Sequence, residues 1–191
     1  MSTTARNAAK IMIIRHAEKP PDSGEPYGID SNGSQDAESL IVLGWQRAGA
    51  LVCFFDPAEG PLQNTEIVTP ATLYASGVAK HSDSKRPQET ITPLAARLGT
   101  TINTSFIKGQ DKEVADSAVA CTGVVLICWE HQEIPKIAGH ILKDSGITVP
   151  AWPGDRFDVV WAFDLDSSTG LYGFSQVPQQ LLAGDKNTII T

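Results

Sequence analysis

The sequence KIMIIRHAEKP, residues 10–20, contains four consecutive apolar residues that stop at the charged segment RHAEK, which is followed by Pro20 and Pro21. An apolar run of this kind predicts a short buried strand. In open α/β sheets ligands bind just beyond the carboxyl ends of the strands, where Arg15 and His16 would stand. Arg matches phosphate oxygens bidentately and neutral His can act as a nucleophile, so this strand end favours phosphoryl chemistry. For this motif alone, the alternative is a strand that ends in solvated charges.

The composition predicts one globular domain, residues 1–191. Of the 191 residues 41% are apolar and 19% charged, which is ordinary for a soluble protein with a substantial core. The formal net charge of −7 argues against a nucleic-acid-binding face and against a basic membrane patch. Any anion that binds must therefore be held by a local cluster of Arg and His.

The cysteines and the N-terminal segment favour the cytoplasm. The three cysteines show no C-x-x-C spacing, and reduced buried thiols are the default interpretation; they are Cys53, Cys121 and Cys128. Residues 1–9 lack the apolar core of a signal peptide, and no apolar run approaches the length of a membrane span. The chain also shows no convincing spacing of metal ligands, so we expect neither a metal nor a cofactor.

A long loop and a helix follow the first strand. Residues 20–39 are rich in Gly, Pro, Ser, Asp and Asn, and a loop of this length directly after Arg15 and His16 is expected to form one wall of a substrate pocket. Apolar residues then recur at helical spacing up to Phe55, with Ser39 as the expected N-cap. Gly44 lies inside this helix, where it costs stability, so we expect a close backbone approach there.

Two later segments carry further candidate groups. Pro87 suits the first turn of a helix that ends at Gly99, so Arg86 stands where free N–H groups and partial positive charge favour an anion. A second continuous apolar run, residues 124–128, again ends in polar residues, among them His131. A lone Arg or His in such a position is usually exposed or structural. Two buried strands that both end near a His favour a shared site instead.

The C-terminal part follows a different pattern. Large apolar residues occupy every second position from Phe157 to Leu165 and alternate with Asp158, Val160, Ala162, Asp164 and Asp166, which predicts a strand with one face in the core. A turn at residues 168–170 then leads into a second strand, residues 171–177. This hairpin is expected to add an antiparallel edge to an otherwise parallel sheet.

Four motifs in this order resemble the histidine phosphatase superfamily, also called phosphoglycerate-mutase-like. They are RHAEKP after an apolar strand, LGWQRA in one helix, RPQET opening another, and a His after a later apolar strand. The resemblance implies an α/β fold, a three-layer α/β/α sandwich, which agrees with the order of elements above. It also implies that His16 accepts the phosphoryl group, and that Arg15, Arg86 and His131 surround the phosphate.

Two departures from the family pattern concern carboxylates. The residue before the second His is usually small in the family but is Glu130 here, so we expect its side chain to point away from the site or to orient an Arg or His. The general acid is ambiguous. Asp111 and Glu113 precede the second strand and Glu133 follows His131; we prefer Asp111 and keep the other two as alternatives.

These residues imply an enzyme that hydrolyses a phosphate monoester or a phosphorylated side chain through a phosphohistidine on His16. The partner is then a small phosphorylated substrate or a phosphoprotein. Two alternatives stay open: a mutase of the same family, which the short chain disfavours, and a non-catalytic module that binds phosphorylated ligands. The sequence leaves the identity of the substrate and the oligomeric state open.

Overall fold

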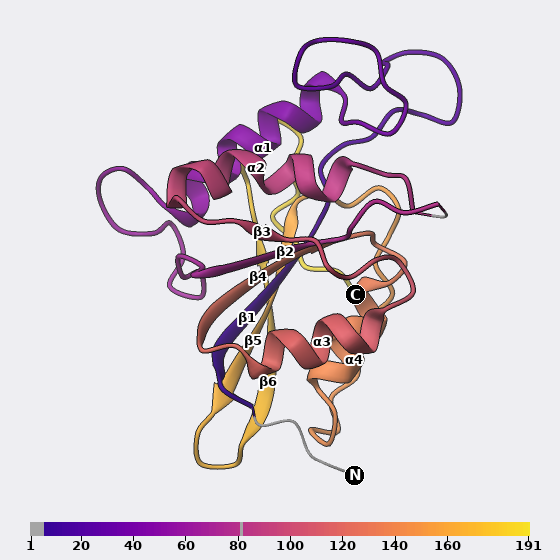
Figure 1. The fold of residues 1–191 in the computed structure, drawn as a ribbon. Helices are drawn as coiled ribbons and strands as arrows, with labels where there is room; N and C mark the ends of the chain where they lie inside the picture. Colours follow the sequence, from indigo (N-terminus) through magenta and orange to yellow (C-terminus); the bar gives the residue numbers. More distant parts are fainter. Residues whose placement is uncertain (1–5, 81) are drawn as a thin grey trace.

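The computed structural model of the protein describes residues 6–80 and 82–191. Within that part of the chain, six strands form one mixed sheet in the order β3-β2-β4-β1-β5-β6 (Figure 1). The strands are β1 (Ala8–Arg15), β2 (Thr72–Ala75), β3 (Ile102–Asn103), β4 (Gly123–Trp129), β5 (Val159–Asp166) and β6 (Leu171–Pro178). The helices are α1 (Val42–Phe55), α2 (Arg86–Leu98), α3 (Asp111–Ala120) and α4 (Ile134–Ile141).

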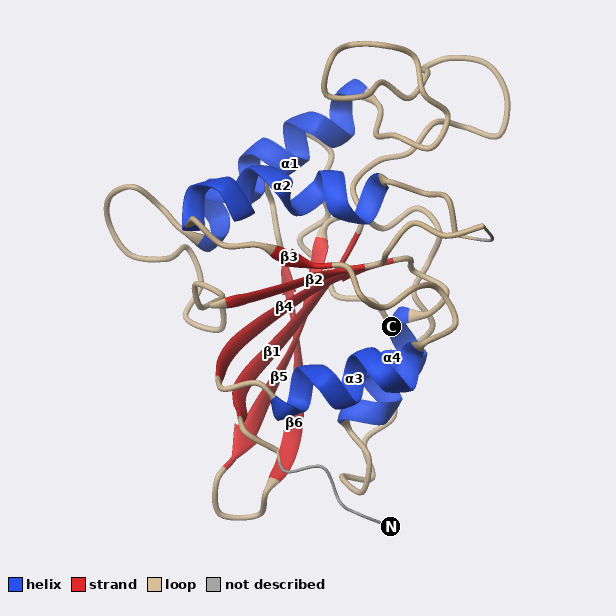
Figure 2. Ribbon diagram, viewed as in Figure 1, coloured by secondary structure: helices blue, strands red, loops and turns tan. Residues whose placement is uncertain are grey.

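The elements form three layers, with α1 and α2 on one face of the sheet and α3 and α4 on the other (Figure 2). Strand β1 shows why its sequence is continuously apolar. Ile11 and Ile13 belong to the core cluster that includes residues of α3 and α4, whereas Met12 and Ile14 belong to the cluster that includes residues of α1 and α2. All four are fully buried, as expected for a central strand covered on both faces. The predicted α/β/α sandwich is confirmed.

The predicted antiparallel hairpin is also confirmed, because β5 pairs antiparallel with both β1 and β6. The prediction that only one face of its first strand is in the core is wrong. Val160 and Ala162, expected on the polar face, are fully buried in the cluster shared with α1 and α2. The reason is the position of β5, which lies between β1 and β6 and not at the edge of the sheet.

Helix α1 begins later than expected. Ser39 is not its N-cap, because Ile41 occupies that position and the Ser39 hydroxyl donates to Glu89 at 2.6 Å. The expected close approach at Gly44 is confirmed. A Cβ on Gly44 would lie 2.5 Å from the carbonyl oxygen of Glu18, so this helix packs directly against the backbone of the RHAEK segment.

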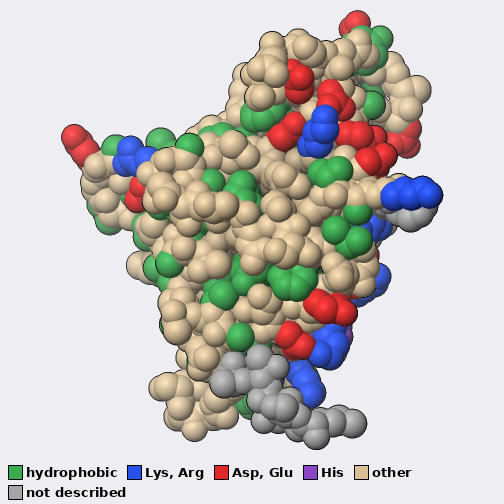
Figure 3. Space-filling view, viewed as in Figure 1, with side chains coloured by type: hydrophobic (Ala, Val, Ile, Leu, Met, Phe, Trp, Pro, Cys, Tyr) green, Lys and Arg blue, Asp and Glu red, His purple; other side chains and the backbone are tan. Residues whose placement is uncertain are grey.

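The carboxyl ends of β1, β2 and β4 lie at the same edge of the sheet, because these strands run parallel. The space-filling view shows that charge is unevenly distributed over the molecule. Acidic side chains gather at the top of the view and Lys and Arg side chains along its right edge (Figure 3). The net negative charge therefore does not prevent a locally basic surface. None of the described helices is long and apolar enough to cross a membrane.

Candidate active site

Backbone hydrogen bonds fix the end of β1 against its neighbours. The N–H of His16 donates to the carbonyl oxygen of Trp129 at 2.9 Å, which continues the pairing of β1 with β4. The N–H of Ala17 donates to the Thr90 hydroxyl at 2.8 Å, and that hydroxyl donates to the carbonyl oxygen of Arg86 at 2.7 Å. The first turn of α2 is thereby joined to the residue that follows His16.

The hydrogen bond of the His16 ring determines which nitrogen is free. Nδ1 lies 2.7 Å from the carbonyl oxygen of Ala17. Because a carbonyl oxygen only accepts, Nδ1 carries the ring proton, and Nε2 keeps a lone pair. Nε2 is then the nitrogen able to attack an electrophile.

His16 is held in its neutral form. Its side chain is nearly fully buried, and burial is the main cause that lowers its pKa to about 3; the positive charge of Arg15 is the next cause, with smaller contributions from Arg86 and His131. The imidazole is therefore an uncharged base throughout the physiological pH range. Arg15, Arg86 and His131 are thus the neighbouring groups whose charges disfavour a protonated His16.

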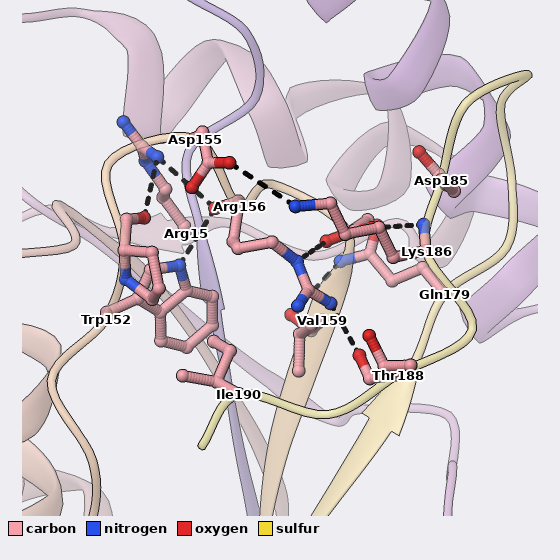
Figure 4. A network of polar contacts seen from close by, with 12 residues as sticks. Arg15, Trp152, Asp155, Arg156, Val159, Gln179, Asp185, Lys186, Thr188 and Ile190 are labelled. Atoms are coloured by element: carbon pink, nitrogen blue, oxygen red, sulfur yellow. Dashed lines mark hydrogen bonds and ion pairs between the residues drawn. The ribbon is translucent and has the colours of Figure 1, made fainter.

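Arg15 is more deeply buried than Arg86 or His131. Its Nη1 donates to the carbonyl oxygens of Gly154 at 2.7 Å, Arg156 at 3.2 Å and Pro153 at 3.4 Å, and Figure 4 shows its guanidinium beside this segment. Its Cζ lies 3.8 Å from the centre of the Phe157 ring, a cation–π contact. Burial lowers the pKa of Arg15 to about 10, so the side chain stays charged at neutral pH.

Both arginines keep donors free. The Nε and Nη2 atoms of Arg15 and the Nε atom of Arg86 are buried and have no hydrogen-bond partner among the described residues. Arg86 is oriented by a bond from Nη1 to the carbonyl oxygen of Ala37 at 2.9 Å, with Glu38 3.5 Å from Nη2. Buried donors without partners are costly unless a ligand satisfies them. An oxyanion between the two arginines would do so.

His131 lies beside Gly154, in the segment whose carbonyl oxygens accept hydrogen bonds from Arg15. A Cβ on Gly154 would lie 3.8 Å from Nε2 of His131, and the carbonyl oxygen of Gly154 accepts from Arg15. Burial, together with the smaller effect of the charges of Arg15, Lys19 and Lys108, lowers the pKa of His131 to about 4. His131 is therefore neutral at pH 7 and can donate one N–H to an anion. The structure thus brings together His16, Arg15, Arg86 and His131.

Asp111 lies close to Glu130 and Glu133, the carboxylates that flank His131 in the chain. It is the first residue of α3 and is buried, and its Oδ1 accepts no hydrogen bond from the described residues. Burial, a hydrogen bond with Glu133 and the negative charge of Glu133 together raise the pKa of Asp111 to about 6. Lys136 lies 3.8 Å from its Oδ2. The charges that act on Asp111 are thus not those that act on His16.

The other two carboxylates after β4 have partners of their own. Glu130, the departure from the family pattern, pairs with Lys108 at 2.9 Å. Glu133 is buried and accepts from the backbone N–H of Gly109 at 2.9 Å and from Nε1 of Trp129 at 3.1 Å. Glu133 is therefore engaged in holding the start of α4 against the loop before α3. Glu113, the third alternative for the acid, is exposed in the first turn of α3.

The motif residue Glu18 turns away from His16 into a buried ionic network. Arg47 donates to both oxygens of Glu18, with the shortest distance at 2.7 Å, to Asp185 at 2.7 Å and to Gln179 at 3.0 Å. Burial lowers the pKa of Arg47, but the hydrogen bonds to Asp185 and Glu18 outweigh it and raise this pKa above its ordinary value. The network ties the segment after β6 to the loop that carries His16.

A cavity of about 340 Å³ adjoins the site. The loop of residues 19–37 forms most of its wall, as expected for this loop, and Arg86 closes the side toward α2. Its other polar lining residues include Lys19, Tyr27 and Gln35. Arg86 therefore borders both the cavity and the space between the arginines and His16.

Sequence reasoning missed three residues of this region. Thr90, Phe157 and Arg47 contact the segment of residues 15–18, as described above. Thr90 and Arg47 lie inside RPQET and LGWQRA, so those motifs contained a signal that had not been assigned a role. Phe157 carries no local signal, because only the tertiary fold brings it against Arg15.

The arrangement of sheet and helices matches the phosphoglycerate-mutase-like fold, known from histidine phosphatases. The structure of the protein histidine phosphatase SixA complexed with tungstate is similar, with a TM-score of 0.51 and 12% sequence identity over 89% of this chain and 97% of that chain. At this identity the similarity establishes the fold alone. No family model and no curated protein matches the sequence.

Two further solved structures are similar at lower scores. The mycobacterial glucosyl-3-phosphoglycerate phosphatase with inorganic phosphate has a TM-score of 0.48 and 13% identity over 87% of this chain and 95% of that chain. A putative alpha-ribazole-5'-P phosphatase from Escherichia coli K-12 has a TM-score of 0.48 and 11% identity over 94% of this chain and 100% of that chain.

Proposed function

We propose that the chain, residues 1–191, acts as a single phosphatase domain that hydrolyses a phosphate monoester or a phosphorylated side chain through a phosphohistidine on His16. One observation carries the proposal. A buried neutral imidazole with a free Nε2 lies within the electrostatic range of two arginines that keep three buried N–H-bearing atoms without partners. A tetrahedral phosphate supplies both an electrophile for the imidazole and acceptors for these donors.

In the first step, Nε2 of His16 attacks phosphorus as the leaving oxygen departs. Arg15 and Arg86 hold the equatorial oxygens, and His131 donates one N–H to them, so that the negative charge is matched by fixed donors. The Nδ1–H bond to the carbonyl oxygen of Ala17 keeps the ring oriented and stabilises the charge that forms on it. In the second step, the carboxylate that protonated the leaving oxygen takes a proton from water as the water attacks phosphorus. The P–N bond breaks, neutral His16 is restored, and phosphate is released with the same donors in place.

We propose Asp111 as the acid that protonates the leaving oxygen. A pKa raised to about 6 by burial and by Glu133 keeps part of the population protonated near neutral pH, as a general acid requires. Glu133 accepts hydrogen bonds from Gly109 and Trp129, so its carboxylate already has partners, and it is the second candidate for this role.

The nucleophile is tested by His16→Ala, with His140→Ala as the matched control, since His140 is exposed in the last turn of α4. We expect His16→Ala to abolish hydrolysis of p-nitrophenyl phosphate without a change in far-ultraviolet circular dichroism, and His140→Ala to retain full activity. A brief pulse of a labelled phosphodonor should leave an acid-labile, base-stable label on the wild type and on His140→Ala but not on His16→Ala. Undiminished hydrolysis by His16→Ala would refute the assignment.

The acid is tested with two leaving groups. Loss of the true acid should slow hydrolysis of an alkyl phosphate by roughly 10²-fold or more but spare p-nitrophenyl phosphate, whose leaving group needs no proton. We expect this selective loss for Asp111→Asn. If Glu133→Gln shows it and Asp111→Asn behaves like the wild type, Glu133 takes the role.

The same assays separate the alternatives. A mutase would retain the phosphoryl group until an acceptor substrate is added, whereas the proposed phosphatase releases phosphate continuously from a single substrate. A binding module would leave p-nitrophenyl phosphate intact.

A further inference from the structure

The cavity beside the phosphate-binding groups has a cation at each of two positions on its wall. Arg86 is shared with the site of His16, and Lys19 lies on the loop side, three residues after His16 in the chain. A substrate whose phosphate contacts Arg86 would extend its remaining part into this cavity.

Lys19 is available for a ligand. Its side chain is 38% exposed and pairs with Asp22 at 3.2 Å, and the Asp22 side chain is fully exposed. An exposed ion pair of this kind contributes only about 0–1 kcal/mol. A substrate anion can therefore replace Asp22 at little cost. The charge of Lys19 also lowers the pKa of His131, which places Lys19 within electrostatic range of the phosphate-binding groups as well as on the cavity wall.

The size and polarity of the cavity narrow the class of ligand. A volume of about 340 Å³ is at the lower end of the range for small-molecule sites. The side chains of Tyr27 and Gln35 in the lining are neutral hydrogen-bonding groups. Asp22 contributes a carboxylate to the lining, and its side chain is fully exposed to solvent. A compact polar molecule with a negative group fits these properties better than a neutral or cationic one.

We infer that the substrate is a small phosphate ester that carries a second anionic group, a carboxylate or another phosphate, and that Lys19 binds this group in the cavity. The inference rests on the proposed phosphatase function, since it assigns the part of the substrate beyond the phosphate that Arg15 and Arg86 hold. Lys19 is thus a specificity-determining residue and takes no part in the chemical step.

The test compares substrates that differ in one charge. 3-Phosphoglycerate and glycerol 3-phosphate share a three-carbon skeleton and differ in a carboxylate against a hydroxymethyl group. Propane-1,3-diol bisphosphate and its monophosphate differ in a second phosphate. We expect the wild type to prefer the more charged member of at least one pair by roughly 10-fold or more in kcat/KM, the usual effect of a hydrogen bond to a charged group. A preference within the first pair alone shows that the second anionic group is a carboxylate. A preference within the second pair alone shows that this group is a phosphate.

Lys19→Met should abolish that preference, because kcat/KM for the more charged member should fall roughly 10-fold further than kcat/KM for the less charged member. Lys19→Arg should retain the preference, because it keeps the charge. Lys143→Met, an exposed lysine after α4, is the matched control and should behave as the wild type. Equal rates for both members of both pairs in the wild type, or an intact preference in Lys19→Met, would overturn the inference.

Hydrolysis of p-nitrophenyl phosphate separates this inference from the proposed function, because that substrate has no second anionic group. If the wild type hydrolyses it but shows no preference within either pair, the phosphatase function stands and the inference fails. If the wild type hydrolyses none of these compounds, the proposed function fails, and calorimetric affinities for the same pairs decide the inference. A roughly 10-fold tighter binding of the charged member that Lys19→Met removes would support it, and equal binding would overturn it.

Discussion

Replacement of Arg47 by Met has the largest expected effect on stability outside the active site. Arg47 is 3% exposed and donates six hydrogen bonds, to Glu18, Gln179 and Asp185. Met fills a similar volume but leaves two carboxylates, whose side chains are 11% and 6% exposed, without a cation. Removal of one partner from a buried ion pair costs about 3–5 kcal/mol. We expect the free energy of unfolding at pH 7 to fall by this amount.

The cost should depend on pH in a direction that the structure fixes. Burial raises the pKa of Asp185, but hydrogen bonds from Arg47 and from backbone N–H groups outweigh it and lower this pKa below its ordinary value. A lowered pKa contributes stability above the unfolded pKa, which is lost as the pH falls through the folded pKa. In Arg47→Met the carboxylate of Asp185 is still buried but has lost its cation. Protonation of this carboxylate as the pH falls therefore removes an unpaired buried charge and stabilises the variant. The difference in stability between wild type and variant should therefore shrink from pH 7 to pH 4.

Urea unfolding followed by tryptophan fluorescence at both pH values measures these differences. Arg97→Met is the matched control, because Arg97 pairs with Asp56 at 2.8 Å on the surface, with side chains 42% and 29% exposed. An exposed pair contributes about 0–1 kcal/mol. If Arg47→Met costs no more than Arg97→Met at pH 7, or if its cost is equal at pH 4, the network is not the buried ionic link inferred here.

Three further changes have expected outcomes. Gly44→Ala should lower the free energy of unfolding, measured in urea, by about 1–3 kcal/mol and should also lower kcat, because its Cβ would meet the Glu18 carbonyl oxygen. Gly49→Ala is the control and should not destabilise the protein, because its Cβ meets nothing within 4 Å. Thr90→Val should lower the free energy of unfolding by about 1–3 kcal/mol, because the buried N–H of Ala17 loses its acceptor. Thr90→Ser keeps a hydroxyl acceptor and should retain the stability of the wild type. With an alkyl phosphate, kcat/KM should fall as the pH rises through about 6, where Asp111 loses its proton. Hydrolysis of p-nitrophenyl phosphate should lack that fall, and an equal fall for both substrates would contradict this role for Asp111.

The central strands were predictable because burial on both faces is visible in the sequence. Residues 11–14 and 124–128 are continuously apolar, and each forms part of a strand of the parallel sheet. The same rule failed for β5. The aspartates at positions 158, 164 and 166 gave the sequence of this strand an alternating pattern. Val160 and Ala162, on the same face, are apolar and are buried beneath α1 and α2, and no local pattern predicts that these helices cover them.

The residues of the site were predictable to the extent that topology alone positions them. Arg15 and His16 end one parallel strand and Trp129, two residues before His131, ends the next, so a shared edge follows from the order of elements. The contacts that orient these groups join distant parts of the chain. Arg15 reaches Gly154, 139 residues later, and Ala17 reaches Thr90, 73 residues later. Such pairings depend on tertiary packing, for which a single sequence carries no local signal.

The placement of carboxylates explains how a chain of net charge −7 can form a site for a phosphate. Three carboxylates lie within two residues of the two histidines of the site, and each is directed to a partner of its own. Glu18 pairs with Arg47, Glu130 with Lys108, and Glu133 accepts from Gly109 and Trp129. With these charges matched locally, the pKa shifts of the two histidines are caused by burial and by neighbouring cations. An incoming phosphate would therefore meet a positive field from the arginines together with the neutral imidazole of His16.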